Sequence, residues 1–83
     1  MYELHVAIKA KKDIKLLSLL NKDALLLAFG EIKEDPYCGK PLMRDLSGKF
    51  SYKIGVYRII YIINEDDGVV EILSAGHRSI IYN

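Results

Sequence analysis

The segment Tyr57 to Ile63 places the strongest constraint on the fold of this chain, because every position in it except Arg58 is apolar or tyrosine. Successive side chains of a strand point to opposite faces, so Arg58, Ile60 and Ile62 share one face and the other residues share the second. A strand with one wet face would instead alternate apolar and polar residues. We therefore expect a strand covered by helices on one face and partly covered on the other, by a partner chain or by the C-terminal tail.

The first third of the chain predicts one strand followed by helix. Apolar residues alternate with polar ones from Tyr2 to Lys9, the period of a strand with one buried face. From Ala10 to about Lys33 the chain is rich in Leu, Lys and Ala and contains no proline, which favours helix.

Two N-cap residues divide this helical region. Asn21 and Asp23 interrupt it, and both residue types cap helices well. We therefore predict an antiparallel pair of helices, Lys11 to Leu20 and Lys22 to Glu34, the second of which ends at Asp35-Pro36.

The second half of the chain predicts sheet. Lys33 to Lys40 is expected to be a loop, Pro41 to Leu46 a short extended piece, and Ser47-Gly48 a turn. Residues rich in β-branched and aromatic side chains then predict three strands, namely Phe50 to Gly55, Tyr57 to Asn64 and Val69 to Ser74. The loop Asn64 to Gly68, which ends in Asp-Gly, is typical of a hairpin.

This order of elements predicts a single domain over residues 1–83, an α+β two-layer sandwich of β-α-α-β-β-β order. An antiparallel sheet would carry the helical hairpin on one face. A hydrophobic content of 51% with 28% charged residues is typical of a folded protein and excludes disorder.

Composition also excludes several classes of protein. No apolar run approaches the roughly twenty residues of a membrane span, and no basic-then-apolar signal opens the chain. The single cysteine, Cys38, cannot form an internal disulfide, so we expect a cytoplasmic protein. His5, Cys38 and His77 are scattered, which predicts no metal site and no cofactor.

Candidate functional residues gather in the C-terminal half, Lys40 to Tyr82. Net charge is only +1, from 12 Lys and Arg against 11 Asp and Glu, so RNA binding must depend on local placement. Arg58 lies among apolar residues and needs an anion, for which phosphate is a natural choice. The expected RNA-binding residues are Lys49, Lys53, Arg58 and Arg78.

Two further side chains could move protons. Tyr82 is either an anchor of the tail or a catalytic residue. His77 is a reserve catalytic candidate, because its ordinary pKa suits proton transfer at neutral pH. If the strand continues through Arg78, however, His77 and Arg78 face opposite sides of the sheet. His5 is expected to be structural and Cys38 an inert thiol.

The chain resembles the RelE/ParE toxin superfamily of bacterial and archaeal toxin–antitoxin modules. The resemblance is carried by Glu34 to Tyr37, Gly39 to Leu42, Asp45 to Gly48, Ser51 to Tyr61, Glu71 to Leu73, and Gly76 to Arg78 followed by Tyr82. The order and spacing of these pieces span about half of the chain. Two positions depart from the pattern, since Gly55 stands where some members carry a second lysine and Val56 where many carry Asp or Asn.

This resemblance implies a metal-independent, ribosome-dependent endoribonuclease that cuts mRNA in the A site, inhibits translation and is inhibited by a cognate antitoxin. Lys53, Arg58, Arg78 and Tyr82 would then be catalytic. The two arginines would bind the phosphate, and Lys53 would add positive charge or exchange a proton. Tyr82 would transfer a proton.

Two alternatives stay open. A ParE-like member would inhibit DNA gyrase without cutting RNA, and the near-neutral charge and the missing second lysine suit that branch. A degenerate toxin would only bind an antitoxin helix through its apolar surfaces. The partners expected are thus an antitoxin in every case, and the ribosome with mRNA in the nuclease case.

Overall fold

The structure of the protein, a computed structural model, describes residues 1–77, apart from the side chain of Leu20. Its elements, in chain order, are β1 (Glu3–Val6), α1 (Ile8–Glu34), the 3-10 turn η1 (Pro36–Cys38), β2 (Lys40–Pro41), the 3-10 turn η2 (Arg44–Leu46), β3 (Phe50–Ile54), β4 (Tyr57–Asn64) and β5 (Val69–His77). Within residues 1–77, no helix is long and apolar enough to cross a membrane.

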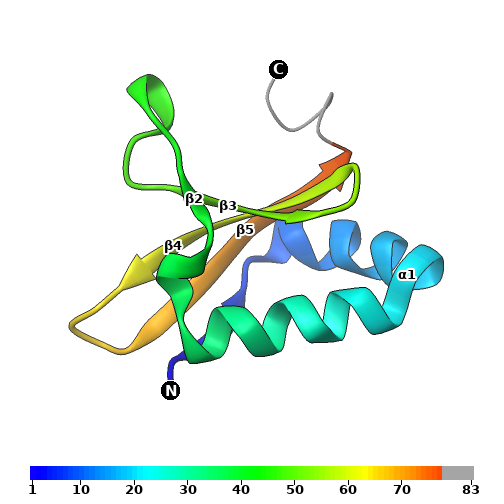
Figure 1. Ribbon diagram of the computed structural model, residues 1–83, viewed down its shortest axis with the longest axis horizontal. Coiled ribbons are helices and arrows are strands. Elements are labelled where there is room, and N and C mark those ends of the chain that lie inside the picture. The colour runs from blue at the N-terminus through cyan, green and yellow to red at the C-terminus, as the bar shows by residue number, and fades with distance from the viewer. Residues whose placement is uncertain (78–83) are drawn as a thin grey trace.

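The element α1 consists of two helical halves that meet at Asn21. This residue has φ −158° and ψ 65°, which is not helical, so the chain turns there as predicted (Figure 1). The strand predicted from Tyr2 to Lys9 is wrong at its end, since β1 stops at Val6 and helix begins at Ile8. Ala7 is the residue at which strand changes to helix. Its N–H donates to the Ile72 carbonyl of β5 at 2.9 Å, and its carbonyl accepts the first helical hydrogen bond, from the Lys11 N–H, at 3.1 Å.

The sheet has the strand order β1-β5-β4-β3-β2. The pairs β2–β3, β3–β4 and β4–β5 are antiparallel, as expected, but β1 lies parallel to β5 and makes the sheet mixed. The α+β two-layer arrangement is confirmed, with both halves of α1 on one face of the sheet (Figure 1).

After α1, strand boundaries differ from the prediction in three further places. The strand β4 has the predicted bounds and β3 is one residue shorter than predicted, whereas β5 continues past Ser74 to His77. It does so because Ala75 and His77 pair with Ile59 and Tyr57 of β4. The extended piece predicted from Pro41 to Leu46 is wrong for most of its length, since β2 ends at Pro41 and η2 follows.

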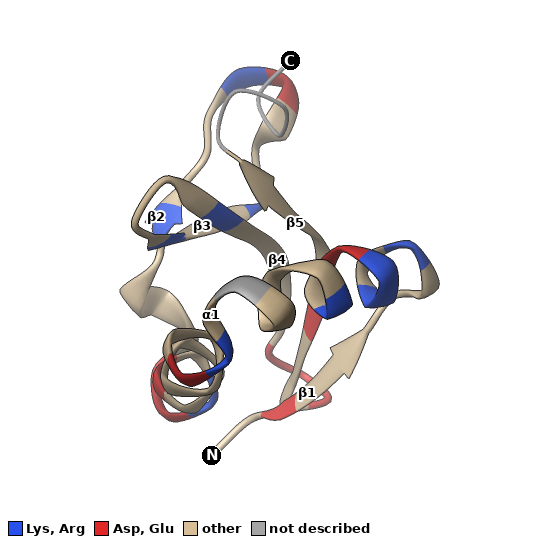
Figure 2. Ribbon diagram, turned by 90° about the vertical axis from the view of Figure 1, so that its right-hand side faces the viewer, with Lys and Arg blue, Asp and Glu red and all other residues tan. Residues whose placement is uncertain are grey.

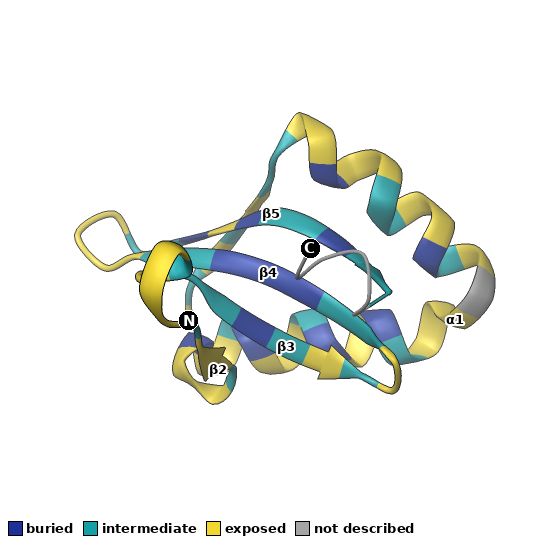
Figure 3. Ribbon diagram, turned by 90° about the horizontal axis from the view of Figure 1, so that it is seen from above, coloured by how far each residue is buried: buried dark blue, intermediate teal, exposed yellow. Residues whose placement is uncertain are grey.

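The core lies between α1 and the sheet. Its fully buried side chains come from α1 and from the faces of β4 and β5 turned toward it, namely Ala10, Leu17, Leu25, Ala28, Ile32, Ile59, Tyr61, Val70, Ile72 and Ala75. Ile60 points to the other face and is still only 6% exposed. Figure 3, seen from above that face, shows the buried centre of β4. The outer face is therefore not open to water at every position, as expected.

Candidate nucleic-acid interface

Lys53 and Arg58 face each other across the β3–β4 hairpin. They are direct partners in the antiparallel register, and alternation along β4 places both on the face turned away from α1. Like charges directly opposite each other in a sheet destabilise it. Neither cation has a carboxylate within ion-pair distance among residues 1–77. The pair is therefore a place where an anion would be bound favourably.

The Arg58 guanidinium is held in place by the turn that precedes β4. Its Nη1 atom donates to the Gly55 carbonyl at 3.2 Å and to the Tyr57 carbonyl at 3.0 Å. The turn has two residues, and its first, Gly55, has φ 59°, a conformation that glycine adopts without strain. Because one nitrogen anchors the group, the rest of its donor fork is oriented in advance for a ligand.

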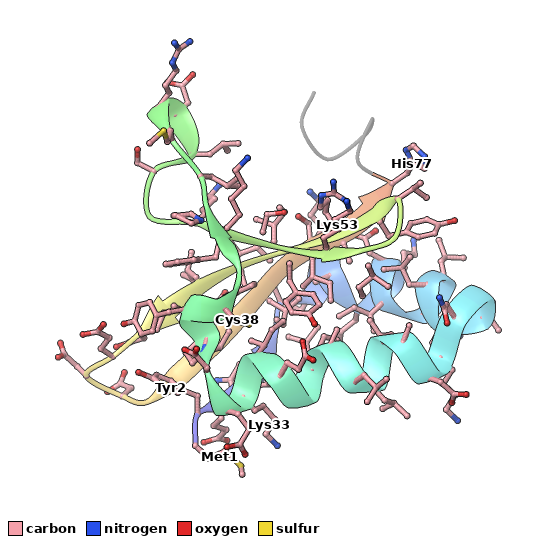
Figure 4. All side chains as sticks on the ribbon, in the orientation of Figure 1. Met1, Tyr2, Lys33, Cys38, Lys53 and His77 are labelled. Carbon is pink, nitrogen blue, oxygen red and sulfur yellow. The ribbon has the colours of Figure 1, made fainter. Side chains whose placement is uncertain are left out.

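A cleft of about 740 Å³ opens beside this cation pair. It curves over the edge of β3, because β2 pairs only with Phe50 and Ser51 and leaves the rest of that edge uncovered. Figure 4 shows Lys53 and Cys38 on either side of β3. The cleft is lined by Glu31, Cys38, Gly39, Lys40, Leu42, Ser51, Tyr52, Lys53 and Arg58.

Glu31 and Tyr52 form the wall of the cleft nearest α1, and sequence reasoning missed both. The Tyr52 hydroxyl donates a short hydrogen bond to Glu31 Oε2. This bond, together with partial burial and the negative charge of Glu31, raises the pKa of Tyr52 to about 12. Tyr52 is therefore a neutral donor at neutral pH, and it keeps the Glu31 carboxylate occupied at a distance from the cations.

The surroundings of the cleft are more cationic than the net charge suggests. Between Cys38 and Ile63 the chain carries one acidic residue, Asp45, against five cations, namely Lys40, Arg44, Lys49, Lys53 and Arg58. Figure 2 shows Lys and Arg on β2 and β3 and acidic residues on β1. Lys49, a predicted RNA-binding residue, lies directly before β3 and is partly exposed. The lining of the cleft thus includes three cations, Lys40, Lys53 and Arg58, against one carboxylate, that of Glu31.

The structure does not bring the reserve candidate His77 to this cleft. His77 pairs with Tyr57, and its ring meets the Tyr57 ring edge-on with centroids 5.9 Å apart, on the face turned toward α1. Together with Asp13, Leu16 and Leu17 it lines a separate cavity of about 270 Å³. There Asp13 Oδ2 accepts from the Ala75 N–H at 3.3 Å. His77 is therefore on the opposite face from Arg58.

Of the remaining candidates, Arg78 and Tyr82 lie outside the described residues. His5 is exposed, contacts Glu3 Oε1 at 3.1 Å and does not line the cleft. Partial burial and the carboxylates of Asp35 and Glu31 raise the pKa of the Cys38 thiol, which favours the unreactive protonated form. Within residues 1–77, His, Cys, Asp and Glu side chains form no group of three that could hold a metal ion.

Known proteins similar to this chain are toxins. Residues 5–82 match the family model described as the ParE toxin of the type II toxin–antitoxin system parDE. The chain is 36% identical over 83 residues to Toxin RelG of Mycobacterium tuberculosis, which covers 98% of this chain and 95% of that protein. It is 38% identical over 82 residues to Toxin RelE of the same organism, with 94% of this chain and 84% of that protein covered.

A solved structure with a similar fold also comes from a toxin–antitoxin system. The structure superposes on a chain of the toxin–antitoxin complex RelBE2 from Mycobacterium tuberculosis with a TM-score of 0.80 and 34% sequence identity. This match covers 93% of this chain and 98% of that chain.

Proposed function

We infer that this chain, which belongs to the RelE/ParE superfamily of toxins from type II toxin–antitoxin systems, cuts messenger RNA in the A site of the ribosome. The observation that carries this proposal is the cross-strand pair of Lys53 and Arg58 in an open, cationic cleft. Neither of these two neighbouring cations has a carboxylate within ion-pair distance among residues 1–77, so the pair can bind a phosphodiester.

The proposed reaction is attack of a ribose 2′-hydroxyl on the adjacent phosphorus, in which the 2′-oxygen gives its proton to a base and the departing 5′-oxygen takes a proton from an acid. The bond from phosphorus to the 5′-oxygen breaks, which leaves a 2′,3′-cyclic phosphate and a 5′-hydroxyl. Arg58 stabilises the charge that grows on the phosphoryl oxygens, because it is always protonated and already oriented by the turn. Lys53 adds positive charge or exchanges a proton. Arg78 and Tyr82 remain the proposed second arginine and proton carrier.

Proton transfer to and from the RNA needs precise alignment. Glu31, the carboxylate that lines the cleft, is bonded to Tyr52, and His77 lies on the other face of the sheet. Lys53 is therefore the proposed proton-exchanging group within residues 1–77, and Tyr82 the one beyond them. We propose that the ribosome supplies the missing alignment by holding the mRNA strand in an attack geometry.

An antitoxin is the second proposed partner. The solved relative RelBE2 is a toxin–antitoxin complex. We propose that a cognate antitoxin inhibits this chain as well. It would use the apolar outer face of the sheet around Ile62, which is partly exposed.

The decisive experiment maps mRNA ends in a translating system. The purified protein is added to ribosomes translating a defined message, and new 5′ ends are located by primer extension. We expect cuts within A-site codons. Lys53→Ala should slow cutting by about 100-fold, since it removes a cation from the transition state. Arg58→Ala and Arg78→Ala should be slowed at least as much.

The matched control is Lys12→Ala, which removes an exposed cation from α1, on the other side of the sheet. Circular dichroism must show every variant folded, because Arg58 also bonds the turn. The nuclease proposal is excluded if no A-site cuts appear, or if Lys53→Ala cuts as fast as Lys12→Ala.

A ParE-like inhibitor of DNA gyrase is the second candidate, because the matching family model is that of ParE toxins. Inhibition of gyrase supercoiling by the purified protein, without cuts in mRNA, would establish this function instead. Cuts in mRNA without an effect on supercoiling would exclude it.

A further inference from the structure

An arm formed by residues 42–49 rises from the sheet on the side away from α1 (Figure 1). Backbone hydrogen bonds close it at both ends. At its base the Leu42 N–H donates to the Lys49 carbonyl at 2.9 Å, and near its tip the Ser47 N–H donates to the Arg44 carbonyl at 3.0 Å. These bonds give the backbone of the arm a defined shape.

Arg44 holds an unusual backbone conformation at the tip of this arm. Its φ of 59° makes it the only residue other than glycine with a positive φ within residues 1–77. A side chain with a Cβ atom is strained in this left-handed region, where glycine is not. An arginine that occupies such a position at a conformational cost points to a use for its side chain.

The side chains near Arg44 suit a nucleic acid. Arg44 is exposed, and the neighbouring Met43 is 80% exposed although it is apolar. An arginine fork matches phosphate oxygens, and an exposed thioether can pack on the face of a base. Lys40 and Lys49 stand at the base of the arm, and its one acidic residue is Asp45.

We propose that this arm is a second RNA contact, in which Arg44 binds a backbone phosphate and Met43 packs on a base beside the strand that is cut. The proposal rests on the nuclease function proposed above. The arm and the Lys53–Arg58 pair lie on the same side of the sheet, and Lys49 and Lys53 are roughly 13 Å apart at about 3.3 Å per residue. One RNA molecule can therefore contact both.

The test measures binding separately from cutting. Fluorescently labelled protein is titrated with ribosomes that carry an mRNA without 2′-hydroxyls in its A-site codon, so that it cannot be cut. The titration covers a series of salt concentrations and includes the variants Arg44→Gly, Arg44→Lys and Lys12→Ala. The titration is repeated with a single-stranded RNA oligonucleotide. Thermal unfolding of each variant is recorded in parallel.

We expect Arg44→Gly to weaken ribosome binding about five- to tenfold and to lower the slope of log affinity against log salt by about 1. Its melting temperature should not fall, because glycine accepts the backbone conformation. Arg44→Lys should restore the salt slope, since it keeps the charge. Lys12→Ala should bind like the wild type.

The oligonucleotide distinguishes two sources of phosphate. If Arg44→Gly loses as much affinity for the oligonucleotide as for ribosomes, the contact is to the mRNA strand. If it loses affinity for ribosomes alone, the contact is to ribosomal RNA. The proposal is overturned if Arg44→Gly binds both the ribosomes and the oligonucleotide as the wild type does. If the wild type binds ribosomes through Arg44 but does not cut mRNA, the nuclease proposal is wrong and the proposed RNA contact of the arm still holds.

Discussion

The hydroxyl of Tyr61 occupies the space that a Cβ atom on Gly39 would need. It also donates a buried hydrogen bond of 2.6 Å to the Pro36 carbonyl. The ring cannot move aside, because Tyr61 is fully buried and stacks on Phe50 with centroids 5.7 Å apart. This contact ties the segment after α1, and with it one wall of the cleft, to the centre of β4.

Gly39→Ala should therefore destabilise the protein. The added methyl would also lie 3.0 Å from the Ser51 carbonyl and 3.1 Å from Tyr61 Cζ, so the backbone around Gly39 must shift. We expect the free energy of unfolding to fall by about 1–3 kcal/mol, the usual cost of overpacking. Urea denaturation measures it, and an unchanged midpoint would show that the contact is looser than described.

Tyr61→Phe should cost about 1–2 kcal/mol by itself, because the buried Pro36 carbonyl loses its donor. Removal of the hydroxyl also makes room for the methyl of Gly39→Ala. The double variant should therefore lose less stability than the sum of the two single losses, by at least about 0.5 kcal/mol. Strict additivity in the double-mutant cycle would contradict this coupling.

Gly30→Ala should have the opposite effect to Gly39→Ala. Gly30 lies inside the second half of α1, and a Cβ atom there would meet nothing within 4 Å. Alanine favours helix over glycine by about 1 kcal/mol, so the free energy of unfolding should rise by up to that amount. A decrease in the same urea assay would mean that the surface of α1 is more crowded than described.

Stability should fall in alkali through Tyr52. The pKa of Tyr52 rises from its ordinary value of 10 to about 12 in the folded protein, because the neutral hydroxyl donates to Glu31. The stabilisation is complete below the unfolded pKa and is lost as pH rises through the folded one.

Urea denaturation at several pH values, from about pH 9 to about pH 12, will measure this loss. Burial raises the pKa of Tyr61 as well, so the wild type is compared with Tyr52→Phe. We expect the stability of Tyr52→Phe to fall less steeply over this range. Parallel curves for the two proteins would disprove the linkage.

Local sequence signals predicted the features that depend on neighbouring residues. N-cap residues predicted the kink at Asn21, and a run of β-branched and aromatic residues predicted the bounds of β4 to the residue. Lys53 and Arg58 were expected in one site, and in the structure they face each other because the period of two and the hairpin turn pair them.

Features that depend on distant segments were missed. Nothing in the residues of β1 indicates β5 as its parallel partner, and the extension of β5 to His77 is stabilised by pairing with Tyr57 rather than by its own β propensity. Glu31 and Tyr52 meet only because the second half of α1 crosses under β3. A carboxylate on a helix surface has no signal in sequence that marks it as the wall of a cleft.

The place of β5 between β1 and β4 also orders events during synthesis. The N-terminal strand leaves the ribosome first, yet its partner in the sheet is not made until the chain has reached His77. Until then the β3–β4 hairpin lacks a neighbour on one side and α1 lacks much of the surface that buries it. We expect a nascent toxin to remain unfolded, and so harmless, while most of its sequence already exists, which gives an antitoxin time to meet it as it folds.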